Sequence, residues 1–223
     1  MEHKRKLIIW DFDGVIADTE KLWLQTRMDL INEKFGLDWD FKTTTSFLAG
    51  MSDKTKKEVL DKIGIKTSDE FWNEAMTRDM QKMLKGFALT DGIEDIFKLK
   101  QFEQCIATGG IASKTAEKIH CVGIEKYFPT DKVFTADMVE YGKPEPDLYQ
   151  LAAEVMGYEP QDCIVIEDSI AGMTAGKRAK MQVIAFLGSE LYNKDYINKE
   201  IKNLGISEIF YNMAEVKQYL LNL

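Results

Sequence analysis

Short apolar runs alternate with stretches of helical periodicity along most of the chain. Each run holds only a few residues, which is the length and character of strands buried in a parallel sheet. The runs are residues 7–10, 105–108, 132–135, 163–166 and 182–186, with a weaker candidate at 209–211. Because helical stretches separate them, the pattern indicates repeated βαβ units. We therefore predict an α/β fold, with a Rossmann-like parallel sheet and helices on both of its faces.

The segment between the first two runs contains no strand candidate. Apolar residues at helical spacing, glycine stops and polar caps predict three helices there. These helices are residues 18–35, 54–63 and 67–85. The threonine-rich stretch 43–46 is expected to be a loop. The pattern thus predicts an all-helical domain at residues 17–86, inserted into an α/β core domain formed by residues 1–16 and 87–223.

Composition narrows the classes of partner. The formal net charge is −8, and no basic arm or stripe is present, which argues against nucleic acid as the main partner. No apolar stretch approaches the ~20 residues of a membrane-spanning helix, so no membrane partner is expected. Three cysteines without disulfide or metal-site spacing suit a reducing compartment and predict a cytoplasmic protein. No amphipathic or apolar stretch remains outside the predicted core that would indicate a partner chain, so a monomer is expected.

The first apolar run ends on two carboxylates. Asp11 and Asp13 follow it, and Gly14 lets the backbone turn away tightly. Ligands bind at the carboxyl ends of strands in open α/β sheets, so this pair would lie at the edge of a site. Two neighbouring carboxylates repel each other unless a cation lies between them or one keeps its proton. The stretch therefore indicates either a Mg²⁺ site or a nucleophile beside an acid, and a solvated turn is the alternative.

Two further elements are suited to binding phosphate. Thr108, Gly109 and Gly110 follow the second predicted strand, where they can offer a hydroxyl and backbone N–H groups at the entrance to a helix. Lys143 stands in the stiff segment 142–147, where it can neutralise charge between a carboxylate and a phosphate. Taken one at a time, the first element is better explained by a tight strand-to-helix turn that needs glycine, and the second by a surface lysine in a proline-containing loop.

An acidic pair, Glu167 and Asp168, ends the fourth predicted strand. Carboxylate oxygens there can bind Mg²⁺, which prefers few carboxylates together with water and phosphate oxygens. Asp168 or Ser169 could instead cap the following helix, and that role is compatible with the first. Because the carboxyl ends of parallel strands meet at one edge, we expect this pair to converge with the groups that follow the first and second strands.

Taken together and in this order, these elements resemble the motifs of the haloacid dehalogenase-like hydrolases over nearly the whole chain. The motifs are Asp11-Phe12-Asp13-Gly14-Val15, Thr108, Lys143 before Pro144-Glu145-Pro146-Asp147, and Glu167-Asp168-Ser169. The helical insert resembles the cap domain of the phosphatase and β-phosphoglucomutase branch of that family. One departure is Lys180, which stands where the relatives usually carry a helix-ending glycine and is expected to affect local stability only.

The resemblance implies hydrolysis of a phosphomonoester through an aspartyl-phosphate. Asp11 would be the nucleophile that attacks phosphorus. Asp13 would protonate the leaving alcohol and then activate the water that hydrolyses the intermediate. Thr108 and the N–H groups of Gly109 and Gly110 would hold the oxygens of the transferred phosphoryl group.

The resemblance also implies a Mg²⁺ cofactor. Its ligands would be the Asp11 carboxylate, the backbone carbonyl of Asp13 and Asp168, with Glu167 at or near the coordination shell. The metal and Lys143 would remove the repulsion between the attacking carboxylate and the phosphate dianion.

The choice of substrate is expected to reside in the helical cap. The mutases of the family carry an arginine where this chain has Asp53, and a carboxylate there would repel a second phosphate. Trp23 likewise replaces a histidine of the mutases. The prediction is a phosphatase for a small phosphorylated metabolite, a sugar or sugar-acid phosphate; a phosphomutase and a non-catalytic phosphate-binding regulator are the alternatives. The candidate pocket residues are Trp23, Met51, Ser52 and Arg78.

Overall fold

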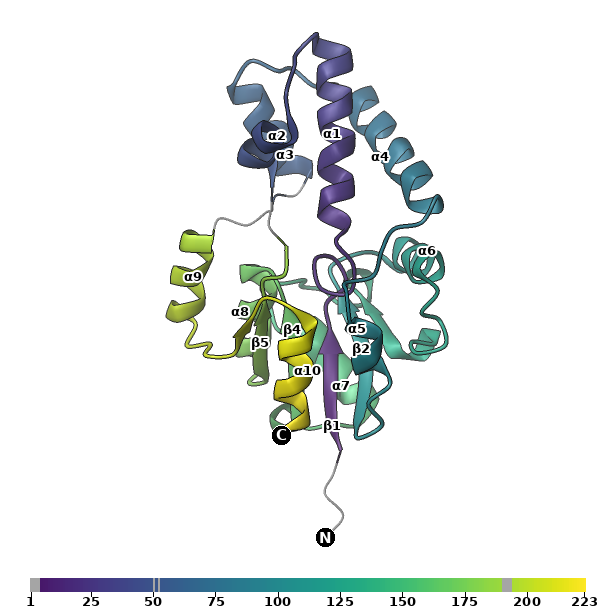
Figure 1. Ribbon diagram of the computed structural model, residues 1–223, viewed down its shortest axis with the longest axis vertical. Coiled ribbons are helices and arrows are strands. Elements are labelled where there is room, and N and C mark those ends of the chain that lie inside the picture. The colour runs from purple at the N-terminus through teal and green to yellow at the C-terminus, as the bar shows by residue number, and fades with distance from the viewer. Residues whose placement is uncertain (1–4, 50, 52, 190–193) are drawn as a thin grey trace. The chain divides into compact units, whose positions relative to one another are not determined.

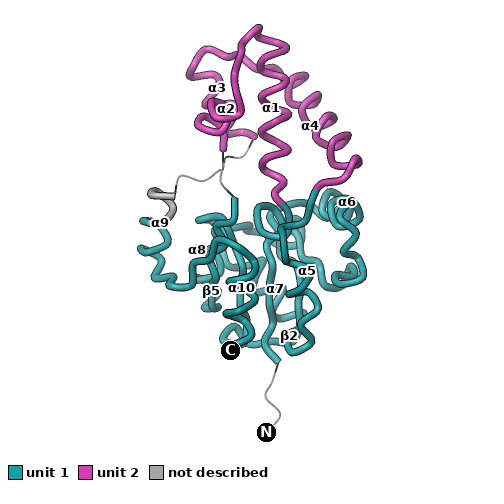
Figure 2. Tube along the Cα trace, in the orientation of Figure 1, with its two compact units in different colours: residues 1–17, 88–223 teal, residues 18–87 magenta. Residues whose placement is uncertain are grey.

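The chain divides into two compact units, which Figure 2 draws in two colours. One unit comprises residues 1–17 and 88–223, and the other comprises residues 18–87. The structure is a computed structural model that describes residues 5–49, 51, 53–189 and 194–223. The first unit is built on a sheet, whereas the described residues of the second are helices and their connections.

Six parallel strands form one sheet among the described residues of the first unit (Figure 1). Their order is β3-β2-β1-β4-β5-β6. The strands are β1 (Lys6–Trp10), β2 (Phe102–Thr108), β3 (Val133–Thr135), β4 (Cys163–Glu167), β5 (Gln182–Phe186) and β6 (Ile209–Phe210). The predicted α/β class with a parallel sheet is therefore confirmed. β1 lies between β2 and β4, with Trp10 in register with Ile106 and Ile166, so all three strands end at the same edge.

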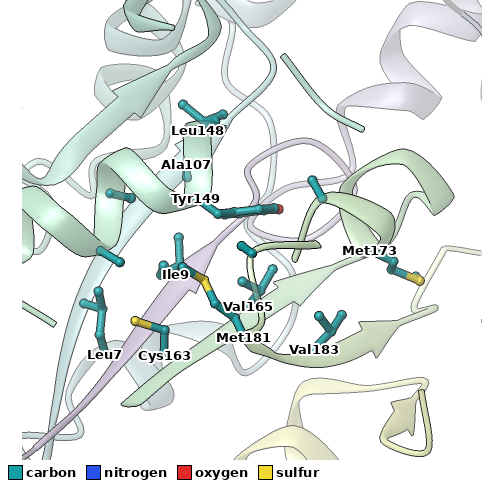
Figure 3. Packing of buried hydrophobic residues seen from close by; sticks show 14 of the residues in the cluster. Leu7, Ile9, Ala107, Leu148, Tyr149, Cys163, Val165, Met173, Met181 and Val183 are labelled. Carbon is teal, nitrogen blue, oxygen red and sulfur yellow. The ribbon is translucent and has the colours of Figure 1, made fainter. Parts of the chain in front are cut away.

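Helices cover both faces of this sheet. They are α5 (Ile93–Phe97), α6 (Ala112–Val122), α7 (Asp147–Met156), α8 (Ile170–Arg178), α9 (Lys194–Asn203) and α10 (Met213–Leu221), with short 3₁₀ turns at Thr130–Lys132, Ala136–Met138 and Pro160–Asp162. Successive side chains of a strand point to opposite faces. On one face Ile9 packs in a cluster with α7 and α8, as Figure 3 shows. On the other face Trp10 contacts Phe97 of α5 edge-to-face, at a centroid distance of 5.6 Å.

The cluster on the α7 and α8 face is the main core of the first unit (Figure 3). Leu7, Cys105, Cys163 and Val165 are completely buried in it, so both cysteines serve as small core residues. Each fully buried aliphatic side chain of this size stabilises the fold by roughly 1.5–3 kcal/mol. No disulfide joins the three cysteines of the chain, all of which the structure describes. The core therefore depends on packing to hold the strand ends of the site in place.

The second unit contains α1 (Thr19–Phe35), α2 (Phe41–Leu48), α3 (Asp53–Lys62) and α4 (Asp69–Leu84). The ends of α1 and α4 follow local signals, as predicted. The Asp18 side chain accepts a hydrogen bond from the Lys21 N–H at the start of α1, and Gly36 ends α1 with a left-handed φ of 63°. Ser68 caps α4 in the same way, by accepting from the Phe71 N–H. None of the described helices is long and apolar enough to cross a membrane.

The predicted loop at residues 43–46 is wrong, because α2 runs through it. Threonine is a modest helix former, and four polar residues in a row suggested a loop. The structure shows two compensations. Asp40 caps the helix by accepting from the Thr43 N–H at 2.7 Å, and the Thr44 hydroxyl donates to the Asp40 carbonyl at 3.0 Å. Burial of Thr44 and Leu48 then favours the helix through packing.

Lys180 lies in the turn between α8 and β5 and has a positive φ of 61°. Residues with a Cβ atom adopt this left-handed region at a cost of about 1–2 kcal/mol, whereas glycine does not. The next N–H, that of Met181, donates to the Gly176 carbonyl at 3.1 Å and ends the helix. The conformation gives the physical reason why a glycine is expected at this position.

Candidate active site

Three strand ends bring the motif residues together. Asp11 follows β1 directly, and its N–H donates to the Ile166 carbonyl of β4 at 3.0 Å. Thr108 is the last residue of β2, and Glu167 is the last residue of β4. β2 and β4 flank β1 in the sheet (Figure 1). The motif residues at the ends of these three strands therefore lie at one edge of the sheet, as expected from the positions of the runs.

Lys143 stands at the centre of this arrangement. Its Nζ donates to Asp11 Oδ1 at 2.5 Å, to Glu167 Oε1 at 2.7 Å and to the Ala107 carbonyl at 3.1 Å. The lysine side chain is 9% exposed, so these contacts are shielded from solvent. The structure thus places a buried cation between two carboxylates that come from different strands. A surface lysine, which was the alternative for Lys143, is wrong.

Both oxygens of Glu167 are held by hydrogen bonds. Oε1 accepts from Lys143 and from the Tyr149 hydroxyl at 3.1 Å. Oε2 accepts from the backbone N–H groups of Asp168 and Ser169, at 2.9 and 2.8 Å, and from the Ser169 hydroxyl at 3.0 Å. The carboxylate of Glu167 is therefore fixed in one orientation, and it fixes Lys143 in turn.

The loop after β2 presents backbone N–H groups at the start of α6. The Thr108 hydroxyl accepts from the Gly110 N–H at 3.3 Å, and Thr108 is 1% exposed. Gly109 is exposed, and Gly110 is partly buried. The Gly110 carbonyl accepts from the Ala136 N–H at 3.0 Å, which ties the loop to the residues after β3. A backbone loop at a helix N-terminus is suited to an anion, as expected for this stretch.

Sequence reasoning missed two residues that contact the motif groups. Lys118 of α6 places its Nζ 2.6 Å from both carboxylate oxygens of Asp13. Tyr149 of α7 donates to Glu167, and its ring lies 4.8 Å from the Lys143 Nζ. Neither has a sequence signal, because each lies within a helix and joins the site through a contact that is distant in sequence.

The charges at the strand ends shift one another's pKa values. Burial opposes the charge of Lys143, but Asp11 and Glu167 outweigh it, so the pKa of Lys143 lies well above its ordinary value. Burial also opposes ionisation of Glu167, but Lys143 and the hydrogen bonds from Ser169 lower its pKa. Burial raises the pKa of Asp11 from 3.8 to about 7; Lys143 lowers it, whereas the charges of Glu167 and Asp13 raise it further.

The same carboxylates fit a divalent cation. Asp11, Glu167 and Asp168 are buried, and one oxygen of each lies within 4.8 Å of the others. Oxygen donors of this kind are those that Mg²⁺ prefers. A cation would also relieve the repulsion from Glu167 that raises the pKa of Asp11. Both oxygens of Glu167 already accept hydrogen bonds, which leaves this carboxylate less capacity to bind a cation directly.

The sequence from residue 8 to residue 186 matches the family model of the haloacid dehalogenase-like hydrolases. The chain belongs to this family. It is 27% identical over 184 residues to the fructose-1-phosphate phosphatase YqaB of Escherichia coli, with 79% of this chain and 94% of that protein covered. It is 26% identical over 181 residues to the phosphorylated carbohydrates phosphatase of Thermotoga maritima, with 79% and 82% covered.

The fold of this haloacid dehalogenase-like hydrolase is also found in solved structures. A haloacid dehalogenase-like protein from Agrobacterium tumefaciens matches it with a TM-score of 0.85 at 22% identity. The match covers 98% of this chain and 99% of that one. At this identity the likeness shows the fold alone.

The candidate pocket residues of the helical unit have varied surroundings. Trp23 on α1 and Met51 before α3 are partly buried, and Ser52 lies outside the described residues. Arg78 pairs with Glu33 at 2.8 Å and with Glu74 at 2.5 Å, at a side-chain exposure of 30%. The contacts of Arg78 are those of a charge on a helix surface. The pocket role of these residues stays a prediction.

The raised pKa of Asp11 predicts how metal-free stability depends on pH. The pKa rises from 3.8 unfolded to about 7 folded, so the folded hydrolase keeps a proton that the unfolded chain releases. The stability contributed by this group is complete below the lower value, falls between the two values, and stays low above the higher one. In EDTA, the difference in free energy of unfolding, Asp11→Asn minus wild type, should therefore rise by roughly 2–3 kcal/mol as the pH increases from about 5 to about 8.

Urea denaturation at several pH values would measure this difference. The Asn side chain has the same shape and does not titrate in this range, so the comparison cancels the titrating groups far from Asp11 and reports on the Asp11 carboxyl together with the groups coupled to it. A difference that stays constant with pH would contradict the raised pKa of Asp11. A difference that falls as the pH increases would mean that Lys143 outweighs burial and lowers this pKa.

Proposed function

We propose that this haloacid dehalogenase-like hydrolase is a Mg²⁺-dependent phosphatase. Its substrate would be a small phosphomonoester, a sugar or sugar-acid phosphate, and its intermediate an aspartyl-phosphate on Asp11. The observation that carries the proposal is the buried contact of Lys143 with Asp11 and Glu167 beside Asp168. The phosphatase names of the relatives from Escherichia coli and Thermotoga maritima support the substrate class.

The first step would be attack of an Asp11 carboxylate oxygen on phosphorus. Lys143 neutralises part of the charge that would otherwise repel the phosphate dianion from this carboxylate. The N–H groups after Thr108 would bind the equatorial oxygens of the phosphoryl group. Asp11 and Asp168 would hold Mg²⁺, which would supply further positive charge to the site. The product of this step would be a mixed anhydride between phosphate and Asp11.

Asp13 would move the protons in both steps. Its charge lies close enough to Asp11 to raise the pKa of that carboxyl. In the first step, Asp13 would give a proton to the ester oxygen as the P–O bond breaks. In the second step, the resulting carboxylate would take a proton from water, which attacks the aspartyl-phosphate and restores Asp11.

Contacts within the helical unit favour a phosphatase over a phosphomutase. Arg27 of α1 is buried, and its Nη2 donates to both Asp53 oxygens at 3.0 Å. It also pairs with the buried Asp79 of α4. Asp53 therefore has a cationic partner, which weakens the repulsion expected of it. Arg27 is itself held by two carboxylates and is 4% exposed, which argues against its gripping a second phosphate.

The proposal is tested by phosphate release from sugar phosphates, sugar-acid phosphates and nucleotides, with Mg²⁺ and with EDTA. We expect one group of sugar or sugar-acid phosphates to be hydrolysed fastest. EDTA should lower the rate by at least about 100-fold, since the metal supplies several kcal/mol of charge stabilisation, and added Mg²⁺ should restore it.

Three other outcomes would contradict all or part of the proposal. Conversion of a hexose 1-phosphate to its 6-phosphate without net phosphate release would establish the phosphomutase. Binding of Mg²⁺ and phosphate without turnover of any ester would favour the non-catalytic regulator. A rate that EDTA leaves unchanged would exclude the metal requirement while leaving the phosphatase activity intact.

A further inference from the structure

The contact between Lys118 and Asp13 is not explained by any of the family motifs. Lys118 lies on α6, 105 residues along the chain from Asp13, and its Nζ is 2.6 Å from both Oδ1 and Oδ2. A single ammonium group that contacts both oxygens equally fixes the plane of the carboxylate. Lys143 also contacts a motif aspartate, but it reaches Asp11 through Oδ1 alone and shares its ammonium group with Glu167. Asp11 and Asp13 therefore each contact a different lysine.

Packing holds Lys118 in this position. Its side chain is 11% exposed, whereas that of Asp13 is 36% exposed. Its Nζ also lies 5.5 Å from the centre of the Phe12 ring, within the range of a cation–π interaction. Fixing a lysine side chain in one conformation costs about 2 kcal/mol of rotamer entropy. The attraction within a solvent-exposed ion pair seldom offsets this cost. The burial of Lys118 thus distinguishes this contact from an ordinary surface ion pair.

We propose that Lys118 is a positioning residue that orients the Asp13 carboxyl group for proton transfer to the leaving alcohol. The proposal rests on the proposed phosphatase function. As the P–O bond breaks, the proton moves from Asp13 to the ester oxygen, and Asp13 becomes a carboxylate. Lys118 then stabilises that carboxylate and keeps it oriented for the water of the second step. Lys118 acts through Asp13 and does not contact the phosphoryl group.

This role predicts a dependence on the leaving group. A poor leaving group such as phenolate needs the proton from Asp13 more than a good one such as p-nitrophenolate. Positioned general acids contribute about 10²–10⁴-fold, so partial loss of orientation should cost about 10-fold or more with phenyl phosphate. With p-nitrophenyl phosphate the loss should be less than about 3-fold, because that P–O bond breaks with little protonation.

The test compares Lys118→Met with wild type on these two aryl phosphates, which differ little in size. The measured quantity is kcat/KM, which covers the steps up to departure of the phenol. Lys114→Met is the matched control, because Lys114 lies one helical turn earlier on α6 and its side chain is 34% exposed. We expect the control to match wild type on both substrates. Lys118→Arg, which keeps the charge, should recover part of the loss with phenyl phosphate and remains informative if the Met variant does not fold.

Each other result has a definite meaning. An equal loss on both substrates would show that Lys118 acts on the phosphoryl group or on the fold, and would overturn the proposal. Unchanged kcat/KM on both substrates would overturn it as well. Wild type that hydrolyses neither aryl phosphate nor any sugar phosphate would contradict the proposed function itself, which separates that failure from failure of the Lys118 role.

Discussion

Replacing Asp11 by Asn is expected to reduce phosphate release by at least about 1,000-fold, since removal of an attacking nucleophile has effects of this size or larger. An amide oxygen cannot form the aspartyl-phosphate, yet it keeps the shape of the side chain and can still accept from Lys143. Steady-state phosphate release measures the loss. Mass spectrometry of rapidly quenched enzyme should detect one added phosphoryl group in wild type and none in Asp11→Asn.

Asp131→Asn is the matched control for this substitution. Asp131 is exposed in the 3₁₀ turn Thr130–Lys132, so the same chemical change there should leave the rate within about 2-fold of wild type. Activity of Asp11→Asn near the wild-type rate would show that another group attacks phosphorus. A phosphoryl group found on the variant would give the same conclusion and would direct the search to the residue that carries it.

Replacing Gly172 by Ala is expected to damage both stability and activity. A Cβ atom at this position on α8 would lie 1.6 Å from Oε1 and 2.0 Å from Cδ of Glu167. Glu167 cannot move aside easily, because it is buried and accepts hydrogen bonds from Lys143, Tyr149 and Ser169. We expect a loss of about 2–4 kcal/mol in the free energy of unfolding, from overpacking and from broken buried hydrogen bonds.

The activity of Gly172→Ala should fall together with its stability, because displacement of Glu167 removes one of the groups that hold Lys143. We expect kcat per folded molecule to fall by about 10-fold or more, as misplaced catalytic groups commonly cause. Urea denaturation and phosphate release at a temperature where the variant is folded measure the two effects separately.

Gly176→Ala is the control on the same helix. A Cβ atom there would lie 2.7 Å from Val183 Cγ2 and 3.5 Å from Val165, which are core residues. It should destabilise the fold by about 1–3 kcal/mol through overpacking while leaving kcat per folded molecule unchanged. Equal losses of kcat in Gly172→Ala and Gly176→Ala would show that the Glu167 contact has no special effect on the site.

Much of the fold follows from local patterns in the sequence. The apolar runs predicted five of the strands to within a few residues, because burial in a parallel sheet requires them to be apolar along their length. Gly36 and Ser68 marked the limits of helices because caps act on neighbouring backbone groups. The loop predicted at residues 43–46 was wrong, since tertiary packing of α2 outweighed the modest helix propensity of threonine.

The sequence predicted those residues of the candidate site that lie at the ends of strands. Asp11, Thr108 and Glu167 each come directly at the end of an apolar run, and the edge geometry of a parallel sheet brings such positions together. Lys143 was singled out by the stiff segment around it, but its contact with Glu167 was not predicted. The position of a residue in the sequence determines whether it lies at this edge of the sheet. It does not determine which side chains at the edge contact one another.

By itself, the sequence determined the α/β class, the helical insert and the motif residues at the strand ends, because these depend on local periodicity and on sheet geometry. The tertiary structure alone decided the contacts of Lys118 with Asp13, of Tyr149 with Glu167, and of Arg27 with Asp53 and Asp79. These pairs join residues of separate helices, strands and loops. Their formation depends on how those elements pack, and a helical position carries no sign of the residue that packing will bring opposite it.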